Sequence, residues 1–169
     1  MTGKYPYRIG YGNMPEANAI LPLTEATMAQ ELQLQGYHTV LIGKWHLGME
    51  RWEYTPRYRG FDEFYGYYGG SISYESMISQ QGHFDLHDQE VLVTDALERS
   101  THLTLLLQQK VDAAIATHAS DYAPSSVPLF LYYAPQNVHL GANEGMQAPA
   151  EYLERCGTSF GTPTSEDQG

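Results

Sequence analysis

Two uninterrupted apolar runs, each preceded by a helical pattern, organise the chain. The first run lies within His38 to Ile42 and follows a segment in which Thr27 and Gln30 fit a capping box and Gly36 stands where a helix would end. The second run is Leu129 to Tyr133. Because strands that are covered on both faces read as continuous apolar runs, we expect both segments to be buried strands.

A longer helical pattern separates the two runs. From Thr94 to His118, apolar residues recur at spacings of three and four, which predicts one long amphipathic helix. A strand, a crossover that contains a helix and a second strand together predict an α/β fold with a mostly parallel sheet flanked by helices.

The remaining segments have no sustained period. Residues 54–83 are rich in Tyr, Gly and Ser, and we interpret them as a long, ordered loop region with short elements. Residues 157–169 form a polar tail that we expect to be disordered. The sequence therefore predicts one domain over residues 1–156, followed by the tail.

Composition narrows the classes of partner. The chain has 169 residues and a formal net charge of -11, with only 9 Lys and Arg, which argues against a nucleic-acid partner. No segment reaches the roughly 18 apolar residues of a membrane span, and no secretory signal pattern stands at the start. Cys156 is the single cysteine, so the chain offers no internal disulfide.

Candidate chemistry follows each predicted strand. Lys44 and His46 come directly after the first strand, and His139 follows the second. Carboxyl ends of parallel strands meet at one edge of a sheet, where ligands bind. A lysine beside a histidine suits a tetrahedral oxyanion, because the ammonium supplies charge and the imidazole transfers protons near neutral pH. The alternative is that Lys44 is a solvated loop charge and that both histidines serve packing or strand ends.

A family resemblance favours the functional interpretation. Five segments carry it in order along the chain: TGKYPYRIG from Thr2, GYHTVLIGKWHLG from Gly36, RGFDEFYGY from Arg59, PLFLYYAPQNVH from Pro128 and PAEYL from Pro149. Together they resemble the sulfatase family, in particular its arylsulfatase B-like group. The resemblance implies an alkaline-phosphatase-like fold and a parent reaction that hydrolyses aryl or carbohydrate sulfate esters.

The resemblance also implies residue roles. Lys44 is similar to the lysine that holds the sulfate and the aldehyde hydrate, and His46 to the base that helps expel sulfate from the modified residue. His139 resembles the histidine that protonates the departing oxygen. Ser71 and Ser73, which follow a Gly-Gly pair, are candidate substrate-binding residues.

Parts of the family's site are missing from this sequence. Its nucleophile is a formylglycine made in a Cys-x-Pro-x-Arg signature, and no such motif occurs, since Cys156 has a different context. The complete family member also binds Ca²⁺, but none of that ligand set is recognisable, so we assign no metal ligand. We expect the isolated chain to be an internal fragment with little or no activity. His83, Asp85 and His87 alternate like metal ligands, although a structural role is the simpler interpretation.

Two alternatives stay open. Besides a sulfuric ester hydrolase fragment, the sequence allows a non-catalytic binding or regulatory paralogue, or a phosphoesterase relative of the same fold. The expected partner is a sulfated small molecule or glycan by resemblance, and a secreted or lysosome-like location is likewise implied only by resemblance.

Overall fold

The computed structural model describes residues 1–10, 20–122, 126–142, 145 and 147–156. The helices and strands are η1 (Pro6–Ile9), α1 (Met28–Leu34), β1 (His38–Lys44), η2 (Trp52–Tyr54), η3 (Pro56–Arg59), β2 (Glu63–Tyr67), β3 (His87–Asp88), β4 (Val91–Leu92), α2 (Ala96–Ser100), α3 (Leu103–Tyr122), β5 (Leu129–Ala134) and α4 (Ala150–Cys156). The tail predicted at 157–169 lies outside the described residues. No described helix combines the length and the apolar character that crossing a membrane requires.

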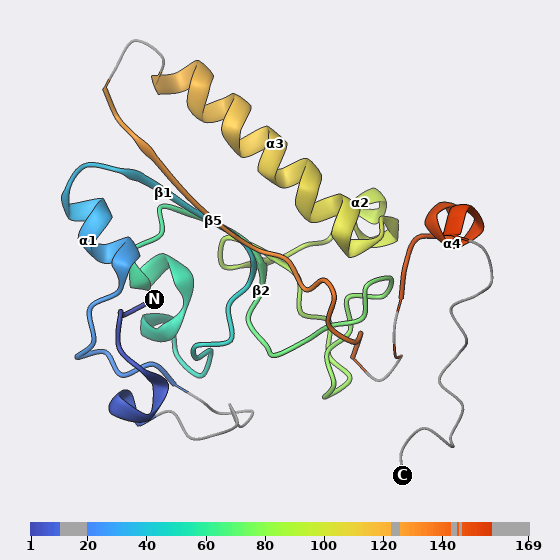
Figure 1. Cartoon of the computed structure of the whole chain (residues 1–169), viewed down its shortest axis with the longest axis horizontal. Coiled ribbons are helices and arrows are strands. Elements are labelled where there is room, and N and C mark those ends of the chain that lie inside the picture. The colour runs from blue at the N-terminus through green and yellow to red at the C-terminus, as the bar shows by residue number, and fades with distance from the viewer. Residues whose placement is uncertain (11–19, 123–125, 143–144, 146, 157–169) are drawn as a thin grey trace.

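A five-stranded sheet in the order β4-β3-β2-β1-β5 forms the centre (Figure 1). Strand β1 pairs in parallel with β2 on one side and with β5 on the other, whereas β3 and β4 extend the sheet in antiparallel fashion. The predicted α/β class and the parallel pairing of the two apolar runs are therefore confirmed.

Alternate residues of β1 enter two different cores, as the pleat of a strand requires. Val40 and Ile42 pack under α3 with Leu103, Leu106 and Leu107, while Leu41 faces the other layer with Ala29 of α1, Phe61 and Phe64. Figure 1 shows α3 crossing one face of the sheet, with α1 on the opposite side. Both faces of β1 are covered, which explains its continuous apolar sequence.

Helix α1 begins as its capping box predicts. The Thr27 hydroxyl accepts from the Gln30 N–H, and the Gln30 side chain accepts in return from the Thr27 N–H. Gly36 follows the helix with a φ of 83°, a left-handed conformation that suits glycine.

The single helix predicted over 94–118 is wrong, because the segment forms two helices. Thr101 adopts an extended conformation between α2 and α3. The hydroxyls of Ser100 and Thr101 both donate to the Leu97 carbonyl and so close the last turn of α2. Apolar spacing continues across this break, so periodicity alone did not detect it. Strand β2 likewise lies inside the region interpreted as mainly loop.

Candidate functional site

Lys44 is the last residue of β1, at the edge where the carboxyl ends of the three parallel strands meet. Gly43 precedes it with a φ of 116°, and a side chain at this position would collide with the Ala134 backbone of β5. Glycine therefore allows β1 and β5 to approach closely next to Lys44. The lysine side chain is half-buried.

His46 continues the line of β1 beyond its end. The Trp45 and His46 N–H groups donate to the carbonyls of Tyr67 and Tyr68, and the Trp45 indole donates to Gly48 and Tyr54 carbonyls. The His46 ring packs on Gly70, where an added Cβ would lie 3.0 Å from its Cε1 atom. The hydrogen bond of the His46 backbone to Tyr68 and the absence of a side chain at Gly70 together set the position of the imidazole.

The loop that carries His139 is held from two sides. Gln136, buried after β5, accepts from the Ile72 N–H at 2.9 Å and donates to the Ile72 carbonyl at 2.7 Å. The Tyr74 hydroxyl donates to the His139 carbonyl at 2.8 Å. The His139 Nδ1 lies 2.9 Å from the Leu140 carbonyl. Since a carbonyl only accepts, Nδ1 carries a proton and Nε2 is the atom left for chemistry.

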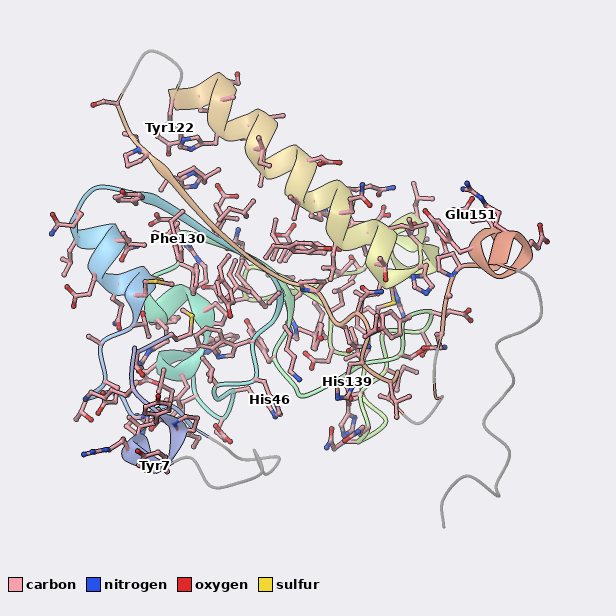
Figure 2. The ribbon with its side chains drawn as sticks, in the orientation of Figure 1. Tyr7, His46, Tyr122, Phe130, His139 and Glu151 are labelled. Atoms are coloured by element: carbon pink, nitrogen blue, oxygen red, sulfur yellow. The ribbon has the colours of Figure 1, made fainter. Side chains whose placement is uncertain are left out.

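Lys44 and His139 face a common hollow of about 460 Å³, whose other lining residues are Pro135 to Val138. The hollow is large enough for a sulfate ester with part of its alcohol. His46 does not line it but lies two residues from Lys44, and Figure 2 shows His46 and His139 on the same side of the molecule, beyond the sheet. The structure thus brings Lys44 and His139 together, with His46 next to Lys44.

The local electrostatics favour an anion. Burial lowers the pKa of Lys44, and burial together with the positive charge of Lys44 lowers the pKa of His46. Both cationic forms are therefore disfavoured in the free chain, and a bound anion would offset this cost for both groups. Among the described residues, neither pKa has a carboxylate among its causes.

Ser71 and Ser73 lie in the segment after β2, and both are buried. Ser73 is fully buried, and its hydroxyl accepts from the N–H groups of Glu75 and Ser76, which supports a local turn. Ser71 directly follows Gly70, the residue under the His46 ring. Their substrate-binding role stays a prediction, and the geometry favours Ser71 over Ser73.

Asp85 and His87 take structural positions. The Asp85 carboxylate accepts from the N–H groups of Tyr68 and Gly69, and the His87 ring packs on Tyr68 at 4.3 Å between centroids. In the part of the chain that the structure describes, no group of three or more His, Cys, Asp or Glu side chains could hold a metal ion. Among the described residues, no calcium ligand is therefore assigned.

The sequence did not reveal the residues that position the site. Gln136 and Tyr74 hold the His139 loop, and Asp85 holds the backbone that leads to Gly70. Only the placement of Gln136 soon after an apolar strand offered a signal, since a buried amide needs backbone partners.

Comparisons with known proteins agree with one another. Residues 1–168 match the family model described as Sulfatase. The chain is 35% identical to mouse (Mus musculus) Arylsulfatase J over 161 residues, which covers 91% of this chain and 25% of that protein. It is 54% identical to human (Homo sapiens) Arylsulfatase G over 68 residues, 39% of this chain and 13% of that protein. The chain thus spans about a quarter or less of these relatives.

Solved structures show the same fold. The crystal structure of Ps i-CgsB superposes with a TM-score of 0.76 at 24% identity, covering 96% of this chain and 37% of that one. The same protein in complex with k-i-k-neocarrahexaose gives a TM-score of 0.71 at 26% identity, covering 92% of this chain and 36% of that one.

Proposed function

The chain belongs to the sulfatase family, and on that premise we propose that it forms the sulfate-binding and proton-transfer part of a sulfuric ester hydrolase site. The observation that carries the proposal is the hollow lined by Lys44 and His139, together with the disfavoured cationic forms of Lys44 and of the nearby His46. An aryl or carbohydrate sulfate ester is the proposed ligand.

Lys44 binds the sulfate group in this proposal. Its half-buried ammonium is a compact charge, and attraction to an anion is stronger there than in open water. His46 lies two residues further on and gains a proton more readily once the anion is bound, because the anion reverses the effect of Lys44. His46 then transfers protons to and from the sulfate side.

His139 acts on the leaving-group side. When the S–O ester bond breaks, the departing oxygen takes the bonding electron pair and needs a proton. The Leu140 carbonyl fixes Nδ1–H, so Nε2 is the atom that carries and delivers this proton. Gln136 and Tyr74 are positioning residues in this proposal, since the Gln136 amide bonds to the Ile72 backbone and the Tyr74 hydroxyl donates to the His139 carbonyl.

We expect the chain alone to bind sulfate esters without turning them over. The family's formylglycine comes from a Cys-x-Pro-x-Arg motif that the sequence does not contain. Without a nucleophile the covalent step is lost, and the remaining acid-base groups supply only a modest share of the rate. This same observation favours a second candidate function, a protein that binds sulfated ligands without catalysis.

Heteronuclear NMR titration tests the proposal. Inorganic sulfate should shift the signals of Lys44, His46 and His139 together, with one dissociation constant, while His38 at the other end of β1 stays unchanged. Inorganic phosphate serves as the comparison ion and distinguishes a phosphoesterase relative. Preference for phosphate, or a response at His38 but not at the three site residues, would refute the proposed sulfate site.

A further inference from the structure

The hollow that Lys44 and His139 share is lined by groups that donate hydrogen bonds. Its lining residues are Lys44, Pro135, Gln136, Asn137, Val138 and His139. The described residues of the lining include no aspartate or glutamate. Acceptor groups at this hollow therefore have to come from amide oxygens, and the partners of these oxygens decide which anion the hollow suits.

Both side-chain amide oxygens of the lining are already paired. Gln136 is buried, and its oxygen accepts from the Ile72 N–H at 2.9 Å. Asn137 is exposed, so a ligand can reach it, and its Oδ1 accepts from the Thr104 hydroxyl at 3.0 Å. This bond directs the oxygen of Asn137 toward α3. The Asn137 nitrogen, which only donates, is then the amide atom that remains for a ligand in the hollow.

The first turn of α3 holds Thr104 in place. Leu103 is fully buried, and its N–H donates to the Tyr74 carbonyl at 2.7 Å. The Thr104 N–H donates to Nδ1 of His102 at 3.3 Å. Tyr74 also donates its hydroxyl to the His139 carbonyl, so this turn and the His139 loop share one support. Both N–H groups have acceptors within the chain, and we therefore assign the turn to positioning Asn137.

Donor groups without a matching acceptor distinguish anions by their protons. Inorganic sulfate has no proton near neutral pH, so all of its oxygens accept. A phosphate group still carries a proton at about pH 6, and this O–H needs an acceptor. An O–H that leaves water without finding an acceptor loses a hydrogen bond. The hollow therefore suits sulfate better than protonated phosphate.

We propose that Asn137 donates to the bound sulfate group and that Thr104, by fixing the Asn137 amide, makes the hollow select sulfate over protonated phosphate. The inference rests on the proposed function for the position of the sulfate at Lys44. It adds a neutral binding residue, a positioning residue on α3 and a physical basis for the choice between the two anions.

Titration calorimetry with inorganic sulfate and inorganic phosphate, at about pH 6, tests the selectivity. Thr104→Val removes the hydroxyl without changing shape or charge, and Thr104→Ser keeps a hydroxyl. Asn137→Asp keeps an acceptor for Thr104 but replaces the N–H donors by a carboxylate oxygen. Thr117→Val is the matched control, because Thr117 lies on the same helix and does not line the hollow. Thermal unfolding first checks that each variant is folded.

The measured quantity is the ratio of the sulfate affinity to the phosphate affinity. Thr104→Val should lower this ratio by about tenfold, equal to one hydrogen bond, because the released amide can turn its oxygen to the phosphate proton. Thr104→Ser and Thr117→Val should keep the ratio of the wild type. Asn137→Asp should lower it further, because a carboxylate repels the sulfate dianion and accepts the phosphate proton.

NMR of the side-chain amide groups tests the Asn137 contact directly. The Asn137 amide signals, identified by their absence from Asn137→Asp, should shift on addition of sulfate with the same dissociation constant as Lys44. Unchanged Asn137 signals at saturating sulfate, or an equal affinity ratio in Thr104→Val and the wild type, would overturn the inference. The proposed function fails separately, if Lys44→Met binds sulfate as tightly as the wild type.

Discussion

The two ends of β1 carry histidines in opposite circumstances. At the first residue, His38 is 8% exposed, and its Nε2 lies 2.9 Å from the Glu63 carboxylate while its Nδ1 lies 3.0 Å from Nδ1 of His118. Tyr122 packs on both rings. Beyond the last residue, His46 lies near the ammonium of Lys44 and against a glycine. At the amino end of the strand, both ring nitrogens of His38 have partners within the chain. At the carboxyl end, burial disfavours the protonated forms of Lys44 and His46.

The difference separates a structural cluster from the proposed binding site. At His38 both ring nitrogens have partners within the chain, so the cluster has nothing to gain from a ligand. At Lys44 and His46, burial disfavours the cationic forms, and a bound anion would offset part of this cost. Residue type alone would not distinguish these two ends.

The largest expected effect is on stability at the amino end. His38→Ala removes two hydrogen bonds in a buried place and leaves His118 and Glu63 without this partner. We expect the free energy of unfolding to fall by about 3 kcal/mol. Chemical denaturation measures the change.

His46→Ala is the matched control at the other end, with an expected loss below about 1 kcal/mol because the ring is half-exposed. If His38→Ala and His46→Ala lower the free energy of unfolding equally, the two ends of β1 do not differ as described.

The next effect is on anion affinity. Lys44→Met should weaken inorganic sulfate binding by about tenfold, or about 1.4 kcal/mol, because a charge-assisted contact is lost. Its unfolding free energy should stay the same or rise, because burial of the ammonium no longer has to be offset. Titration calorimetry measures the affinity.

Lys110→Met is the matched control, since Lys110 forms a 2.7 Å ion pair with Glu98 away from the hollow. Sulfate binding that falls equally in both variants would show an effect of net charge and not of a site.

The smallest effect concerns pH. The pKa of His46 is lowered in the folded chain, so the unfolded chain binds the proton more readily between the ordinary value of 6.5 and the lower folded value. Stability contributed by neutral His46 is present above about pH 6.5 and is lost as the pH falls toward the folded pKa. Solvent screening keeps this below about 1 kcal/mol.

His46→Gln should flatten this part of the profile of unfolding free energy against pH. Denaturation at several pH values between about 5 and 7 measures it. A steeper slope in the variant than in the wild type would mean that the sign of the shift is wrong.

The sequence predicted the framework better than its details. The capping box at Thr27 and the two apolar runs depend on local pattern, and the box and both strands formed. The expectation that both strands are buried holds for β1 but is wrong for β5, because β5 lies at the edge of the sheet, where Tyr132 and Tyr133 are 36% and 40% exposed. The break at Thr101 and strand β2 depend on side-chain bonding and on strand pairing across the chain, which periodicity does not encode.

For the site, sequence placed Lys44 and His139 after adjacent strands, and the structure places both on one hollow. The contacts that hold the His139 loop join residues more than sixty positions apart, so the partners of Gln136 and Tyr74 could not be recognised beforehand. The partners that make His38 structural were hidden for the same reason, since Glu63 and His118 are distant in sequence.

The most direct measurement is the NMR titration of the His46 ring against pH, with and without saturating inorganic sulfate. The free chain should show a pKa below the ordinary histidine value, and sulfate should raise it, because the anion compensates burial and the charge of Lys44. If sulfate binds the chain but the pKa of His46 does not change, the carboxyl end of β1 is not the anion site.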